Sequence, residues 1–419
     1  MGFLKNRQID QEEMWFSAPF AGAVCAGCVA DEALSHFVAG NLDSTECSFC
    51  GRSGESAVAA DTDTVLTYVS ECLKREWSRA IDEYLHDAES GTGYAGPCYA
   101  TDEVLDSEGP VFANEAFEKF VHEAFRDTQW APKDYAAINE GEALRFGWTG
   151  LAETVKHRQR FFFSLVAEPE DDGPGAEVPR GRAMLDQLGE LILKYGLVRK
   201  IPRDRCIYRC RTHKSNERPT TAGELGPPPP AKALQSRMSP AGIPMLYAAD
   251  ETNTTLAETI DEEHPDAEAA TIATFKLRKD CLVVDLRDLP LVPSMFQSGI
   301  ETTDRRYELG FLHGFCLDLS GPVARDGREH IDYVPTQVVA EYLRFVFRDG
   351  DGQQIQGVAW ESSKLPGTHN VVLFIDASQC VDAGGRGDGF SEPLVELVNS
   401  ELARTRPWAA GVGSGESAS

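Results

Sequence analysis

Four cysteines in the first fifty residues have the spacing of metal ligands. Cys25 and Cys28 are separated by two residues, Cys47 and Cys50 repeat that spacing, and eighteen residues lie between the two pairs. A two-residue spacing lets one tight turn present two thiolates to one ion, so two such turns complete a tetrahedral shell of sulfur ligands. Because four cysteines leave no open coordination position, the sequence predicts a structural zinc ion that stabilises a segment lacking a core of its own.

A second group of residues, beyond position 200, could bind a small polyanion. From Ile201 to Tyr247 the chain has eight Lys or Arg and three acidic residues, although its formal net charge is −27. Arg209 and Arg237 lie in this stretch, and a planar guanidinium offers paired N–H groups that match phosphate oxygens. Tyr247 is on a predicted strand and Glu258 on a helix eleven residues later. This strand–turn–helix could direct both side chains into one cleft.

Four segments of the second half together resemble the RES domain, a family named for its Arg, Glu and Ser. No segment is decisive alone, but their order and spacing make the resemblance specific. They are Ile207–Arg211, Ser236–Glu258, Asp332–Gln337, and Gly357–Ser363 followed by Asn370–Phe374. The resemblance implies a mixed α/β fold similar to that of the ADP-ribosyltransferases. It also implies that the domain acts on NAD⁺, since some members degrade NAD⁺ by hydrolysis, some by phosphorolysis, and others attach ADP-ribose to a protein.

The resemblance also assigns roles to individual residues. It makes Arg237, Glu258 and Ser362 the expected catalytic residues, and Tyr208, Arg209 and Tyr247 the expected substrate-binding residues. Cleavage of the nicotinamide–ribose bond develops positive charge on the ribose, and a carboxylate such as that of Glu258 would stabilise this charge.

The position of the serine is open by one residue. Where RES domains often have Tyr-Pro-Ser, this chain has Trp360-Glu361-Ser362, followed by Ser363. Residues alternate between the two faces of a strand, so only one of the two serines would face the cleft. We favour Ser362 as a hydrogen-bonding group and not as a nucleophile, because the sequence offers no Ser/His/Asp set. Gln337 is expected either to line the cleft or to cap the helix that follows it.

The periodicity of apolar residues indicates which elements carry these groups. Up to about position 195 the patterns are mainly helical, including one long amphipathic helix over Thr64–Asp87. After Pro202, short β-rich segments alternate with helical ones. We therefore predict a multidomain α+β protein. Its parts would be a zinc-binding segment (1–60), a helical bundle (61–198), a RES catalytic domain (199–385), and a C-terminal helix with a disordered tail (386–419).

The helical half resembles the HEPN domains that are fused upstream of RES domains. Some HEPN domains are metal-independent ribonucleases with an Arg-x₄₋₆-His motif, and Arg79 and His86 fit this spacing. On one continuous helix a separation of seven residues is about two turns, so both side chains would share a face. A ribonuclease is therefore a rival hypothesis, although the strongly negative charge of the chain weighs against RNA as a substrate.

These observations together predict an NAD⁺-degrading glycohydrolase or phosphorylase that acts as a toxin or phage-defence effector. The alternatives are an ADP-ribosyltransferase with a protein target, the HEPN ribonuclease, and a non-catalytic regulatory or interaction protein. The charge of −27 argues against nucleic-acid partners. The absence of a signal-like apolar segment and of any apolar run of roughly 20 residues predicts a cytoplasmic protein without a membrane partner. The sequence leaves open the acceptor, the oligomeric state, and the identity of an antitoxin or activating partner.

Overall fold

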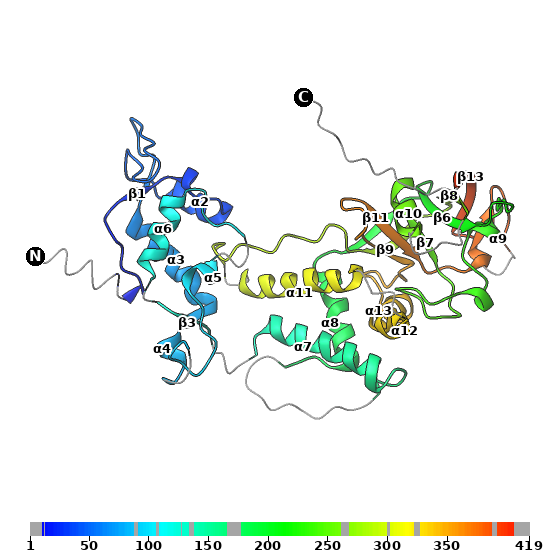
Figure 1. Ribbon diagram of the computed structural model, residues 1–419, viewed down its shortest axis with the longest axis horizontal. Helices are drawn as coiled ribbons and strands as arrows, with labels where there is room; N and C mark the ends of the chain where they lie inside the picture. The colour runs from blue at the N-terminus through cyan, green and yellow to red at the C-terminus, as the bar shows by residue number, and fades with distance from the viewer. Residues whose placement is uncertain are drawn as a thin grey trace, which may run out of the picture. The chain divides into compact units, whose positions relative to one another are not determined.

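A computed structural model of the chain describes residues 11, 13–87, 91–105, 109–126, 128–133, 138–165, 177–260, 268–299, 302–321, 327–387 and 392–405. The chain divides into two compact units (Figure 1). Unit 1 comprises Met1–Ala143, Asp171–Glu177 and Leu291–Gly310, and unit 2 comprises Leu144–Glu170, Val178–Pro290 and Phe311–Ser419. The last fourteen residues, 406–419, which include the predicted disordered tail, lie outside the described residues.

Unit 1 is mainly helical and packs around a large hydrophobic core. Its elements are β1 (Ala23–Val24), η1 (Ala26–Cys28), α2 (Glu32–Gly40), β2 (Ala60–Asp61), α3 (Thr62–Glu76), β3 (Trp77–Arg79), α4 (Ala80–Glu83), α5 (Thr101–Leu105), α6 (Glu115–Ala124) and β4 (Trp130–Pro132). Phe117, Phe125 and Trp130 are among its largest fully buried side chains. Met295 and Phe296 join the same core from a segment much later in the chain.

One predicted helix of unit 1 is wrong in its second half. We expected it to continue to Asp87, but α3 ends at Glu76 and Trp77–Arg79 form β3, which pairs antiparallel with β4. Two of the apolar residues that extended the helical pattern do not face a core, because Ile81 is 65% and Leu85 83% exposed. Pairing with a distant strand therefore overrides the local helical pattern.

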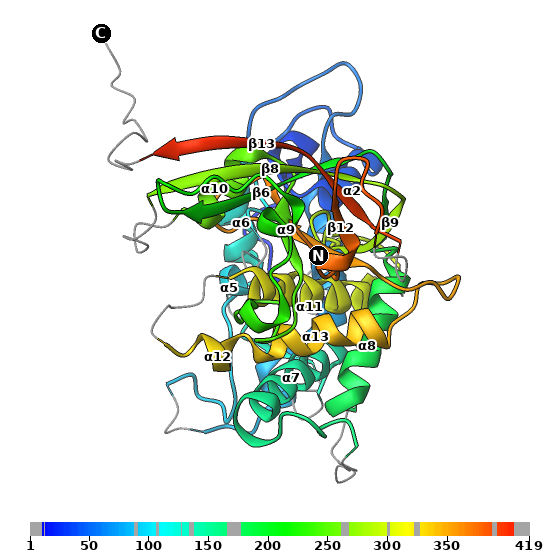
Figure 2. The same cartoon turned by 90° about the vertical axis from the view of Figure 1, so that its right-hand side faces the viewer.

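Unit 2 contains a nine-stranded mixed sheet with the order β12-β13-β8-β6-β7-β11-β10-β9-β5. The long strands β13 and β8 of this sheet lie side by side in Figure 2. Its strands are β5 (Val198–Ile201), β6 (Cys206–His213), β7 (Leu246–Ala249), β8 (Ala269–Leu277), β9 (Cys281–Asp285), β10 (Gly357–Glu361), β11 (His369–Leu373), β12 (Cys380–Asp382) and β13 (Val395–Thr405). Its helical elements are η3 (Thr154–Arg158), α8 (Gly181–Lys194), α9 (Ala222–Leu225), η4 (Pro230–Lys232), α10 (Thr252–Thr259), α12 (Glu329–Asp332), α13 (Val334–Phe345) and η5 (Ala377–Gln379). Two more helices, α7 (Glu140–Glu153) and α11 (Thr302–Ser320), contribute residues to both units.

The end of the chain does not form the predicted C-terminal helix. Val395–Thr405 are instead strand β13, which pairs antiparallel with β8 and parallel with β12. Val395 is fully buried, and Leu397 lies in the same core. Long-range pairing of this kind leaves no signal in a local sequence pattern, so residues 395–405 correct our expectation for 386–419.

Strand alternation separates a core face of the sheet from a face that carries polar groups. Leu246 and Ala248 of β7 pack in the core with residues of α9. Tyr208 pairs with Ala249, and Ala249 pairs with Asn370, so these three residues lie on the opposite face.

The sheet also opens at one place. β6 pairs with β8 along its whole length but with β7 only through Tyr208 and Ala249. The two strands therefore separate after a single pair, and α10 is tied to β6 there by a hydrogen bond from the Cys210 backbone N–H to Thr255 Oγ1 (2.8 Å). We call this opening the fork.

Among the residues that the structure describes, no helix is long and apolar enough to cross a membrane.

Candidate functional site

The carboxylate of Glu258 is the centre of a polar cluster in unit 2. Glu258 lies on α10, directly after the strand that carries Tyr247. Its Oε1 accepts hydrogen bonds from Ser362 Oγ (2.5 Å) and from Asn370 Nδ2 (2.8 Å). Both donors are buried. Residues from α10, from the end of β10 and from β11 therefore converge on one oxygen atom, and Oε2 has no hydrogen bond among the described residues.

The proton of Ser362 has a defined direction. Its Oγ accepts the backbone N–H groups of Lys364 (3.3 Å) and Leu365 (3.2 Å). A hydroxyl has one proton and two acceptor lone pairs, so with both acceptor positions used the proton points to Glu258. Ser362 is only 2% exposed, whereas Ser363 is exposed. The geometry therefore places Ser362, and not Ser363, at the carboxylate.

Arg237 and Tyr247 lie in the same electrostatic neighbourhood. Burial lowers the pKa of Arg237, while electrostatic interactions with Tyr333, Glu258 and Tyr247 act in the opposite direction. Two N–H groups of Arg237 are already used, because Nη1 donates to Leu319 O (2.7 Å) and Nη2 to Gly321 O (2.7 Å). The guanidinium thus neutralises the carboxyl end of α11.

The phenol of Tyr247 is held by the loop that carries Arg237. Its hydroxyl accepts the Met238 backbone N–H (3.0 Å) and contacts Ser239 Oγ (3.1 Å). Gln337 fixes this loop from the other side, because its Nε2 donates to Ser236 O (2.9 Å) and Ser239 O (3.3 Å). Gln337 therefore holds the backbone of the loop, which differs from both roles expected for it.

Replacing Gln337 with alanine is expected to loosen this loop. Two carbonyl groups would lose their donor, which we expect to destabilise the domain by about 1–3 kcal/mol. Thermal unfolding of the purified chain measures this as a lower Tm. Gln187→Ala is the matched control, because Gln187 bonds only to Glu190 on the surface of α8 (3.3 Å) and its loss should leave the Tm unchanged. Equal Tm values for both variants would contradict the expectation.

Arg209 lies at the fork and has an unpaired buried donor. It follows Tyr208, where β6 and β7 separate, and its Nη1 is buried without a hydrogen-bond partner in the described part of the chain. Burial and the neighbouring Arg211 lower the pKa of Arg209 to about 10, so the guanidinium remains charged at neutral pH. A buried cation with an unused N–H is unfavourable unless an anion satisfies it. Burial raises the pKa of Tyr247, and the positive charge of Arg209 opposes this increase. Both side chains therefore lie near the fork.

Sequence reasoning missed Asn370 as a site residue. It lies at the start of β11, in the segment Asn370–Phe374 that contributed to the family resemblance, but we gave it no role. A polar side chain next to four apolar residues of a buried strand was the available signal, because buried polar groups need partners. Its partner is Glu258, which no local pattern could identify.

The four cysteines of unit 1 form one compact group. The sulfur atoms of Cys25, Cys28, Cys47 and Cys50 all lie within 4.8 Å of one another, and three of the separations are 3.5, 3.7 and 3.8 Å. Four sulfurs at about 2.3 Å from a tetrahedral ion would be about 3.8 Å apart. Gly51, with φ of 70°, allows the turn after the second pair. The donor set and its spacing therefore fit a four-coordinate metal ion.

Ionisation of this group is uneven. Burial raises the pKa of Cys28, and hydrogen bonds with the other three thiols raise it further. Burial also opposes ionisation of Cys47, but backbone N–H groups of Cys50, Phe49 and Cys25 outweigh it and lower the pKa of Cys47 to about 7. The Cys25 N–H lies 3.3 Å from the Cys47 sulfur, so the backbone already stabilises a thiolate at this ligand position.

The proposed ribonuclease motif has a different geometry from the one expected. Arg79 ends β3 and forms an ion pair with Asp82 (2.8 Å), whereas His86 lies beyond α4 in an isolated bridge with Tyr94. They do not share a helix, so the prediction that one helical face presents both is wrong. Both side chains nevertheless line one cavity of about 1230 Å³ together with Arg126.

Models of two known protein families match parts of the chain. Residues 40–169 match the model of HEPN/RES N-terminal domain 1, and residues 207–388 match the model of the RES domain. The second match includes all six residues predicted for the site in unit 2. No curated protein and no solved structure is significantly similar to the chain. The chain therefore contains a RES domain preceded by a HEPN/RES N-terminal domain, as the sequence predicted.

Proposed function

We propose that the RES domain of this chain cleaves the bond between nicotinamide and ribose in NAD⁺. The observation that carries the proposal is the Glu258 carboxylate, which Ser362 and Asn370 hold through one oxygen while the other is left for a ligand. The buried, unpaired Nη1 of Arg209 supports it, because this atom needs an anion such as the diphosphate of the dinucleotide.

The chemistry of the site suits this reaction. As the C–N bond breaks, its electron pair leaves with nicotinamide and the ribose gains positive charge. A preorganised carboxylate stabilises that charge in the transition state more than in bound NAD⁺. Arg209 and Arg237 would hold the diphosphate, and Tyr247 would support a ring of the substrate. With water as the acceptor the products are nicotinamide, ADP-ribose and one proton.

Incubating the full chain with NAD⁺ tests the proposal. We expect the chain to release nicotinamide, which chromatography of the reaction mixture detects. Free ADP-ribose indicates hydrolysis, and ADP-ribose 1″-phosphate formed only with added phosphate indicates phosphorolysis. Label from NAD⁺ on a protein would support the alternative, ADP-ribosyl transfer. Absence of nicotinamide release, both with and without added phosphate, together with absence of label on any protein, would overturn the proposal.

Depletion of NAD⁺ would stop growth of the cell that makes the enzyme. We therefore propose a role as a toxin or defence effector, held in check until it is needed.

We also propose that the four cysteines bind zinc, because four thiolates in a closed shell favour this ion and leave no position for catalysis. Cys25, Cys28, Cys47 and Cys50 would hold the ion, and its contribution would be structural.

A further inference from the structure

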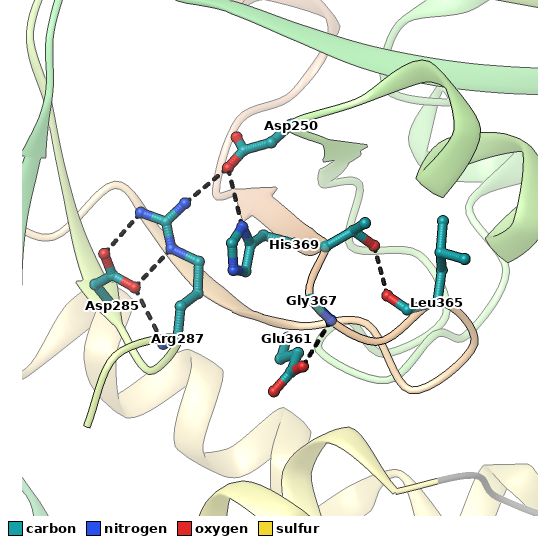
Figure 3. A network of polar contacts seen from close by, with 8 residues as sticks. Asp250, Asp285, Arg287, Glu361, Leu365, Gly367 and His369 are labelled. Carbon is teal, nitrogen blue, oxygen red and sulfur yellow. Dashed lines mark hydrogen bonds and ion pairs between the residues drawn. The ribbon is translucent and has the colours of Figure 1, made fainter. Parts of the chain in front are cut away.

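On the reverse side of the strand that carries Asn370, four charged or titratable side chains form one network (Figure 3). Arg287 Nε and Nη2 donate to the two carboxylate oxygens of Asp285, each at 2.7 Å. Its Nη1 donates to Asp250 Oδ2, also at 2.7 Å. The Nδ1 atom of His369 lies 3.7 Å from the same oxygen. Arg287 is therefore held by two carboxylates from different strands.

The ion pairs of Arg287 are largely shielded from solvent. The side chains of Arg287, Asp250 and Asp285 are only 22%, 18% and 10% exposed. Burial would raise the pKa of Asp285, but hydrogen bonds from Arg287 outweigh burial and lower it. In turn Asp285 raises the pKa of Arg287. A bidentate Arg–carboxylate pair of this kind fixes direction as well as distance.

The topology of the sheet gives the network its significance. Asp285 ends β9 and Asp250 follows β7, whereas β11 and β10 lie between these strands in the order β7-β11-β10-β9. Arg287 therefore connects the ends of β7 and β9. The two strands between them, β11 and β10, position Asn370 and Ser362. The Asp250 backbone N–H also donates to His369 O (3.1 Å).

The same network fixes the start of the helix that carries Glu258. α10 begins at Thr252, two residues after Asp250. Neighbouring residues of β11 point to opposite faces, so His369 faces the network while Asn370 faces the carboxylate. Nothing in the described residues brings Arg287 into contact with Glu258, and any influence on it passes through β7 and β11.

We propose that Arg287 is a positioning residue of the RES site, which holds Glu258, Ser362 and Asn370 in register by joining Asp285 to Asp250. The proposal rests on the function proposed above. Arg287 affects the geometry of the Glu258 carboxylate and not the binding of the diphosphate. Loss of the Arg287 side chain should therefore lower kcat with little effect on KM.

Steady-state kinetics with NAD⁺ test this role. For Arg287→Gln we expect kcat to fall roughly 10- to 100-fold, as misplacement by about 1 Å can cause, while KM stays within roughly threefold. Arg287→Lys should recover little, because an ammonium cannot replace the three directed bonds. Added guanidinium should restore part of kcat to Arg287→Ala. The matched control is Arg182→Gln, which removes an exposed pair with Asp186 (3.2 Å) and should behave as wild type.

Amide hydrogen exchange without substrate separates this inference from the proposed function. In Arg287→Gln we expect faster exchange confined to α10 and the start of β11. If wild type does not cleave NAD⁺ but this local effect is seen, the function fails and the positioning role stands. An unchanged kcat in an active enzyme overturns the positioning role. So does faster exchange throughout the sheet, since Arg287 would then only stabilise the fold.

Discussion

Replacing Glu258 with glutamine is expected to abolish NAD⁺ turnover while preserving the fold. The amide oxygen of glutamine can still accept the hydrogen bonds from Ser362 and Asn370, so the packing of α10 should survive. Only the negative charge that stabilises the ribose in the transition state is lost. Because electrostatic stabilisation of this kind is usually a large contribution, we expect kcat to fall on the order of 10³-fold.

The measurement is release of nicotinamide, with the Tm as a check on folding. Glu251→Gln is the matched control, because Glu251 is exposed at the start of the same helix and makes no capping hydrogen bond. It should retain full activity. Wild-type turnover in Glu258→Gln would exclude Glu258 from the mechanism, because stabilising the positive charge on the ribose is the only catalytic role we give this carboxylate.

The sequence was sufficient to predict the pieces of the site that follow one another closely. Tyr247 and Glu258 lie on a strand and on the helix after it, as their spacing indicated. Local geometry of this kind depends on few residues. The CxxC pairs are similar, because each turn is determined by its own four residues and the two turns need only meet once.

Long-range pairing determined what the sequence could not predict. The end of α3 depends on pairing of β3 with β4, and the strand at 395–405 depends on β8. Asn370 is a site residue only because β11 lies beside β7, more than a hundred residues away in the chain. In the same way, Leu291–Gly310 belongs to unit 1 although it follows much of unit 2. Periodicity reports the face of an element but not the partner of that face.

Removing the metal is expected to unfold the cysteine-rich part of unit 1. Cys25, Cys28 and Cys47 are buried in the same core as Leu34 and Val38 of α2. Without an ion, the four sulfur atoms would face one another at less than 4.8 Å, and burial raises the pKa of Cys25 and of Cys28. Since structural zinc contributes about 10–16 kcal/mol of apparent binding free energy in small domains, its loss exceeds what the short elements around it can offset. Elemental analysis should find zinc bound to the purified chain, and a strong chelator should lower the Tm.

Cysteine variants distinguish this role from a general effect of the chelator. Cys28→Ser should lose zinc and show fast amide exchange in η1, in α2 and around Gly51, where the Gly51 N–H donates to Cys47 O (3.0 Å). Cys98→Ser is the control, because Cys98 lies in unit 1 but outside the group of four sulfurs, and it should keep both zinc and stability. If Cys28→Ser lost its zinc but kept its protection from exchange, the sulfurs would be neighbours only through packing. The metal could then not be what holds this segment together.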